Sequence, residues 1–91
     1  MADRHAPDEL LSFPCLYEFK AFGAAADDAF AEAVRLAVSQ VMPVGHDALR
    51  TKLSSGGKYQ SITVLARLEN SAQLTNIYAI LRGIEGMLYL L

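Results

Sequence analysis

Cysteine is almost absent from this chain. The sequence features of a disulfide-bonded, a membrane-spanning or a nucleic-acid-binding protein are missing too. Cys15 is the single cysteine, which excludes an intramolecular disulfide and a cysteine metal cluster and suits a reducing compartment. No apolar run approaches the roughly 18 residues of a membrane span. The chain also has no basic run of the kind that binds the phosphate backbone of a nucleic acid. With 8 basic against 10 acidic residues, we expect a cytoplasmic protein that contacts no membrane and disfavours nucleic acid as a partner.

What the chain does have is enough apolar material for a core. Hydrophobic residues make up 53% of its 91 residues and charged residues 20%, a balance typical of a folded globular domain. The first nine residues are polar, contain Pro7 and lack the apolar segment of a signal peptide. We expect a mobile leader over 1–9 and one free-standing domain over 10–91.

Strand and helix periodicities follow one another along the chain. Apolar and polar side chains alternate with period two in three stretches, as in half-buried strands, and an apolar run makes a fourth. Apolar residues recur at helical spacing in two further stretches, which Asp27 or Asp28 and Asn70 or Ser71 can cap. We expect strands at 15–22, 46–53, 58–68 and 87–91, and helices at 27–42 and from 70 or 71 to about 83 or 86.

The order βαββαβ predicts an α+β, ferredoxin-like fold, a four-stranded antiparallel sheet with two helices on one face. A swapped order of the edge strands is the alternative topology. Gly56, Gly57 and Lys58 superficially resemble a phosphate-binding loop, but that motif needs an earlier glycine, a Ser or Thr after the lysine, and a following helix. The segment instead predicts a hairpin turn between two strands.

No group of residues has the spacing of an active site or a metal centre. His5, His46 and Cys15 lack partners at metal-ligand or triad spacing. We therefore expect no enzyme activity, no metal and no cofactor. The RNA recognition motif shares the same element order, but it needs alternating aromatics on the third strand. Here Tyr59 is the only outward aromatic, because Ser61, Thr63 and Leu65 take the following outward positions. RNA binding is the weakest functional hypothesis.

The sheet face away from the helices is the most informative surface. It is either ordinary solvated surface or an association site, and we predict an interaction face around Phe22, Tyr59 and Leu65. The last strand is an apolar edge without a blunting Lys or Pro, which predicts pairing with another copy. The alternation places these residues on the open face: Leu16, Glu18, Lys20, Phe22, Arg50, Lys52, Tyr59, Ser61, Thr63, Leu65, Arg67, Leu88 and Leu90.

Three short segments in order resemble the YbeD-like family of bacterial proteins of uncharacterised function over about residues 10–91. They are Leu10-Leu11-x-Phe13-Pro14, Phe19-Lys20-x-Phe22-Gly23 and Ser54-Ser55-x-Gly57-x-Tyr59-x-Ser61-Ile62-Thr63. The resemblance implies a fold similar to ACT regulatory domains, which bind small effectors at dimer interfaces. It also implies that Gly23, after the first strand, is an effector-binding position; the alternative is that Gly23 only makes a tight turn.

These observations lead to three functional hypotheses. The first is a small non-enzymatic regulatory or ligand-sensing module resembling ACT domains, which acts in trans, self-associates and takes a small metabolite near Gly23. The second is an adaptor that binds an unidentified protein partner on the open sheet face. The third is an RNA-binding domain. The chain departs from the family around Ala24-Ala25-Ala26, in the loop where an effector would bind.

Overall fold

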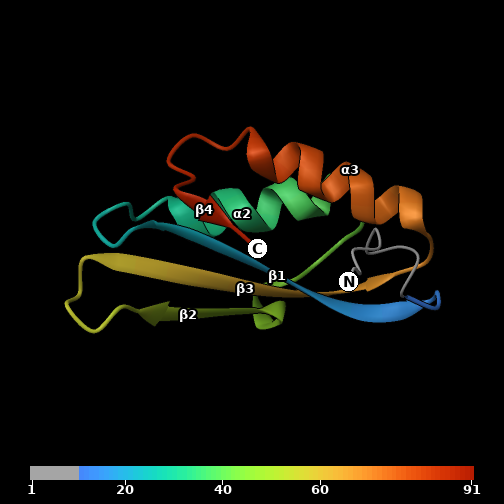
Figure 1. Cartoon of the computed structure of the whole chain (residues 1–91), viewed down its shortest axis with the longest axis horizontal. Helices are drawn as coiled ribbons and strands as arrows, with labels where there is room; N and C mark the ends of the chain where they lie inside the picture. Colours follow the sequence, from blue (N-terminus) through green and yellow to red (C-terminus); the bar gives the residue numbers. More distant parts are fainter. Residues whose placement is uncertain (1–10) are drawn as a thin grey trace, which may run out of the picture.

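Both helices lie on one face of a four-stranded antiparallel sheet in the computed structural model, which describes residues 11–91 (Figure 1). The strand order is β2-β3-β1-β4, which confirms the ferredoxin-like prediction and shows which strands form the edges. The leader predicted for residues 1–9 lies outside the described residues. The elements are β1 (Cys15–Ala24), α2 (Phe30–Ser39), η1 (His46–Ala48), β2 (Leu49–Leu53), β3 (Tyr59–Leu68), α3 (Ser71–Arg82) and β4 (Tyr89–Leu90).

The two central strands, β1 and β3, pair along their whole length, from Cys15 opposite Leu68 to Ala24 opposite Tyr59. Alternating side chains on both strands put one apolar row beneath the helices, as the sequence predicts. The expected end of the first strand at residue 22 is wrong by two residues. Gly23 does not stop the strand, because its backbone continues the pairing with β3.

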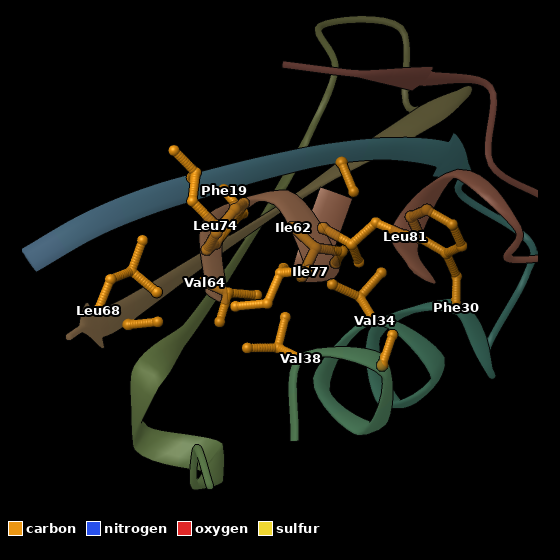
Figure 2. Close-up of a cluster of buried hydrophobic side chains, with 13 residues drawn as sticks. Phe19, Phe30, Val34, Val38, Ile62, Val64, Leu68, Leu74, Ile77 and Leu81 are labelled. Carbon is orange, nitrogen blue, oxygen red and sulfur yellow. The ribbon is translucent and has the colours of Figure 1, made fainter. Parts of the chain in front are cut away.

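The hydrophobic core fills the space between this apolar row and the helices (Figure 2). Each helix contributes one stripe at helical spacing, so the sheet and both helices bury their apolar faces together. The largest side chains that are almost fully buried are Phe19, Phe30, Ile62, Leu68, Ile77, Leu81, Val34, Val38 and Val64.

The helix boundaries differ from the sequence prediction at α2 and agree at the start of α3. Helix α2 begins at Phe30 rather than 27, because a tight turn precedes it. The Asp27 carboxylate accepts from the Ala29 N–H at 3.2 Å, and the Asp27 carbonyl accepts from the Phe30 N–H at 3.2 Å. The Asn70 cap of α3 is confirmed, since its side chain accepts from the Gln73 N–H at 3.0 Å.

The two edge strands are shorter than predicted, and the facing of the last one is partly wrong. Residues 46–48 form a 3₁₀ turn, and β2 starts at Leu49. In β4, Tyr89 pairs with Phe22 and Leu90 pairs with Ala21. Cross-strand partners share a face, so Tyr89 lies on the open face and Leu90 lies toward the helices. Residues 87–91 are apolar on both sides, so they have no alternation from which the facing of each side chain can be predicted. A shift of one residue, which reverses every side chain, leaves the pattern unchanged.

An ion cluster fastens α2 to the loop that follows it. The Arg35 guanidinium donates to both carboxylate oxygens of Glu32 and, through Nη1, to the Val44 carbonyl at 3.1 Å. His46 Nε2 lies 3.1 Å from Glu32 Oε1. The hydrogen bond from Arg35 lowers the pKa of Glu32 from 4.5 to about 2, and the charge of Arg35 and the His46 contact act in the same direction, against partial desolvation.

This lowered pKa predicts an acid-dependent contribution to stability. A carboxylate with a depressed folded-state pKa stabilises the fold above its unfolded value and loses that contribution as the pH falls through the folded value. We expect the wild type to have a higher melting temperature than Glu32→Gln at neutral pH. This difference should disappear as the pH falls from 4.5 to about 2. Thermal denaturation across that range measures it. Glu85→Gln, outside the cluster, is the control, and its difference in melting temperature from wild type should not show this pH dependence. A difference for Glu32→Gln that stays constant with pH would contradict the prediction.

Candidate functional site

The strand register arranges the open sheet face in rows that run across the sheet. One row crosses all four strands as Lys52, Ser61, Phe22 and Tyr89. The Phe22 and Tyr89 rings lie beside each other, with centroids 5.8 Å apart. An aromatic pair therefore stands at one end of this row and a lysine at the other, with a small serine between them.

The next row runs through Arg50, Thr63 and Lys20. Thr63 is buried although it lies on the open face, because its longer neighbours stand on both sides of it. Arg50 Nη2 lies 3.4 Å from a carboxylate oxygen of Glu18, so its charge has a partner. Within residues 11–91, neither Lys20 nor Lys52 forms an ion pair.

A hollow of about 480 Å³ lies where these rows meet the hairpin. Small serine side chains in the middle and long side chains around them create it. Two of the residues predicted to form the interaction face, Phe22 and Tyr59, are brought together here. The lining residues are Lys20, Phe22, Lys52, Leu53, Ser54, Ser55, Tyr59, Gln60 and Ser61.

The hairpin gives this hollow a defined wall. The Ser54 N–H donates to the Tyr59 carbonyl at 2.9 Å, and the Tyr59 N–H donates to the Ser54 hydroxyl oxygen at 3.1 Å. Gly57 has φ 71°, a conformation that favours glycine. The sequence prediction of a hairpin turn is confirmed, and the turn holds Tyr59 at the edge of the hollow.

Leu65, the third predicted interaction residue, lies apart from the other two. It pairs with Glu18 on β1 and lines a separate depression of about 150 Å³ beside Arg50. Its side chain is 42% exposed. Sequence alternation identified the correct face for all three residues, but it could not show that only two of them share a hollow.

Gly23, the position that the family resemblance implies for an effector, is buried. A β-carbon added to it would lie 2.8 Å from Cδ2 and Cε2 of the Phe30 ring. The close approach is therefore made by a side chain of the protein's own core. Gly23 makes no tight turn either, since it lies within β1 and its φ is not positive. Its predicted role in effector binding stays a prediction.

The buried Gln60 and the half-buried Tyr17 and Tyr78 make polar contacts within the protein's own fold. Gln60 donates from Nε2 to the carbonyls of Ala24 and Asp27, at 2.8 and 2.9 Å, and so holds the loop between β1 and α2. The hydroxyls of Tyr17 and Tyr78 are 2.9 Å apart, and burial, together with that hydrogen bond, raises the pKa of Tyr78. These contacts satisfy buried polar groups, as a stable core requires.

Residues 11–91 contain neither a metal-binding cluster nor a membrane-spanning helix. Within that range, no three His, Cys, Asp or Glu side chains gather in a way that could hold a metal ion. None of the helices there has the length and apolarity to cross a bilayer. A second hollow, of about 500 Å³, lies away from the open face, between the start of α2 and the loop before β4. It is lined by Asp27, Ala29, Phe30, Ala33, Ile84, Glu85 and Gly86.

Comparison with known proteins places the chain in a family. Residues 8–91 match the family model "Protein of unknown function (DUF493)". A UPF0250 protein of Shewanella putrefaciens is 39% identical over 80 residues, 88% of this chain and 89% of that protein. UPF0250 protein IL0958 of Idiomarina loihiensis is 37% identical over 84 residues, 92% of this chain and 93% of that protein.

A solved structure gives the same result for the fold. The solution structure of protein HP0495 from H. pylori matches with a TM-score of 0.66 at 19% identity, and the match covers 98% of each chain. At that identity the likeness concerns the fold, and it agrees with the ferredoxin-like prediction. The sequence matches confirm the resemblance to YbeD-like proteins, and the chain belongs to the bacterial DUF493 (UPF0250) family.

Proposed function

We propose that this protein is a small non-enzymatic regulatory module that acts in trans and binds through the sheet face left open by its helices. The observation that carries the proposal is the placement of Phe22, Tyr59 and Tyr89 on that face, outside the core. Aromatic side chains contribute strongly to binding where a partner covers them. The buried Gln60 side chain holds the protein's own backbone, which suits a binding role better than a chemical one.

The proposed module also self-associates along β4. This strand is an edge of the sheet, and residues 87–91 carry no charged side chain. The opposite edge, β2, carries Arg50 and Lys52, charges of the kind that prevent edge-to-edge pairing. Tyr89 is 61% exposed at the uncharged edge. A second copy of the chain, paired along β4, would cover it.

Sedimentation velocity from micromolar to millimolar protein tests this association. We expect wild type to form a dimer as its concentration rises, and Tyr89→Lys to weaken the dimer by about tenfold, roughly 1.4 kcal/mol. Leu36→Lys is the matched control, because it adds the same charge at an exposed apolar position on α2. A wild type that stays monomeric throughout, or an equal effect of Leu36→Lys, would contradict the proposal.

The second candidate function is a protein-interaction adaptor without a small ligand. The exposed Leu65 favours it, because this residue places an apolar side chain on the open face outside the hollow. In a binding assay with a purified partner, an adaptor would lose affinity on Leu65→Asp as much as on Phe22→Asp. A module whose ligand sits in the hollow would be affected by Phe22→Asp alone.

A further inference from the structure

We propose that the hollow beside the hairpin binds a small organic anion. Its phosphate or carboxylate group would lie between Lys20 and Lys52, and an attached planar ring would pack on Tyr59. This inference names a ligand for the open face and therefore rests on the proposed function. It goes further by assigning a site, a charge and a shape to what is bound.

Charge is the first support for an anion. The chain as a whole carries a formal charge of -2, yet the two charged side chains that line the hollow, Lys20 and Lys52, are both cationic. Lys52 pairs with Ser61 on one side of β3, and Lys20 pairs with Thr63 on the other. Their strands are two spacings apart, about 10 Å, so two flexible lysine stems can converge over Ser61.

Polar donors complete the anion-binding end. The Ser61 hydroxyl lies 3.5 Å from the Lys52 carbonyl, the outer limit of a hydrogen bond, so it can turn toward a ligand at little cost. Ser54 and Ser55 line the same hollow. Lysine ammonium groups and hydroxyls together give the charge-assisted hydrogen bonds that phosphate and carboxylate oxygens accept.

Size and apolar lining indicate that the anion carries a further group. The volume of about 480 Å³ lies in the range of small-molecule sites, and a single inorganic anion would leave most of it empty. Phe22 and Tyr59 supply aromatic surface at the other side of the hollow, and Tyr59 is 47% exposed. A planar ring on the ligand would cover this surface.

The lining also discriminates against amino acids as the ligand. A free amino acid has an ammonium group that a carboxylate stabilises most strongly, and no Asp or Glu lines the hollow. An ammonium group placed near Lys20 and Lys52 would be repelled. A mononucleotide meets the requirements better, because its phosphate is anionic and its base is planar.

An NMR titration of the ¹⁵N-labelled protein tests the inference with three probes: adenosine 5′-monophosphate, inorganic phosphate and adenosine. We expect the monophosphate to shift the amide signals of Lys20, Ser61 and Tyr59, and to bind more tightly than either fragment. Lys20→Met and Lys52→Met should each weaken its binding by about tenfold. Tyr59→Ala should weaken the binding of the monophosphate and leave the binding of inorganic phosphate unchanged.

Arg67→Met is the matched control. Arg67 is an exposed cation near the far end of the same face, opposite Leu16, and its loss should leave monophosphate binding unchanged. The inference is overturned if the hollow signals do not move, if adenosine binds as tightly as the monophosphate, or if Arg67→Met has the effect of the lysine variants. Tighter binding of single-stranded RNA with a steep salt dependence would also overturn it, in favour of a nucleic-acid surface.

The two proposals fail separately. Sedimentation of wild type and Tyr89→Lys reports on assembly without any added ligand. If the NMR signals do not shift and the dimer still forms, the proposal of a regulatory module is supported and the proposal of an anion site is contradicted. If the monophosphate binds and the protein remains a monomer at every concentration, the anion site stands and self-association through β4 falls.

Discussion

Phe19→Ala is expected to lower the free energy of unfolding by about 3–5 kcal/mol. Phe19 is fully buried, and its ring contacts the rings of Tyr17 and Tyr78, with centroids 4.9 and 5.1 Å away. Alanine would leave a cavity between β1 and α3 that rigid neighbours cannot fill. Small domains are stable by about 5–15 kcal/mol, so the loss should be large. Urea denaturation measures it as a lower midpoint at an unchanged slope.

Leu16→Ala is the matched control for this prediction. Leu16 lies on the same strand but on the open face, and it is 64% exposed. Its truncation should change the free energy of unfolding by no more than about 0.5 kcal/mol. Similar losses for the two variants would mean that β1 does not present the Phe19 side to the core. A loss below about 1 kcal/mol for Phe19→Ala would lead to the same conclusion.

The central part of the fold could be predicted from the sequence because two independent signals agree there. In β3, alternation puts Ile62 and Val64 on one side and Ser61 and Leu65 on the other, and the structure buries the first pair. The hairpin at Gly57 then sets the register of β2 against β3. Where alternation and turn chemistry agree, one arrangement of the strands is strongly favoured.

The prediction was wrong at the chain segments where only one signal is present. Residues 87–91 are almost uniformly apolar, so nothing in the sequence shows that Tyr89 rather than Leu90 faces outward. The sequence predicts that α2 begins at residue 27, because Asp27 or Asp28 can cap a helix. In the structure Asp27 forms the turn before the helix instead, and the same residue type satisfies both geometries.

The candidate site, too, could be predicted only in part from the sequence. Alternation put Phe22, Tyr59 and both lysines of the hollow on the open face, which the structure confirms. It could not show that Lys20 and Lys52 line one hollow. They lie on β1 and β2, and β3, inserted between those strands, pairs Lys52 with Ser61 and Lys20 with Thr63. Long-range register of this kind depends on tertiary packing rather than on local sequence.

Gly23→Ala is expected to lower the free energy of unfolding by about 1–3 kcal/mol, a large effect for the addition of one methyl group. The new β-carbon would lie 2.8 Å from two atoms of the Phe30 ring, and that ring is almost fully buried. Neither the ring nor β1 can move without disturbing the core. Gly56→Ala is the matched control, because nothing lies within 4 Å of its added β-carbon. It should be neutral or stabilising by about 0.4–1 kcal/mol.

A second substitution separates packing from ligand access at this glycine. If the cost of Gly23→Ala comes from the Phe30 ring, Phe30→Leu should recover part of it, with a coupling free energy of about 0.5–3 kcal/mol in a double-mutant cycle. If Gly23 instead served the approach of an effector, Gly23→Ala would leave unfolding unchanged and weaken only ligand binding. Urea denaturation of the four proteins in the cycle distinguishes these results. A Gly23→Ala protein with unchanged stability and weakened ligand binding would place the effector at the junction of β1 and α2 rather than in the hollow beside Tyr59.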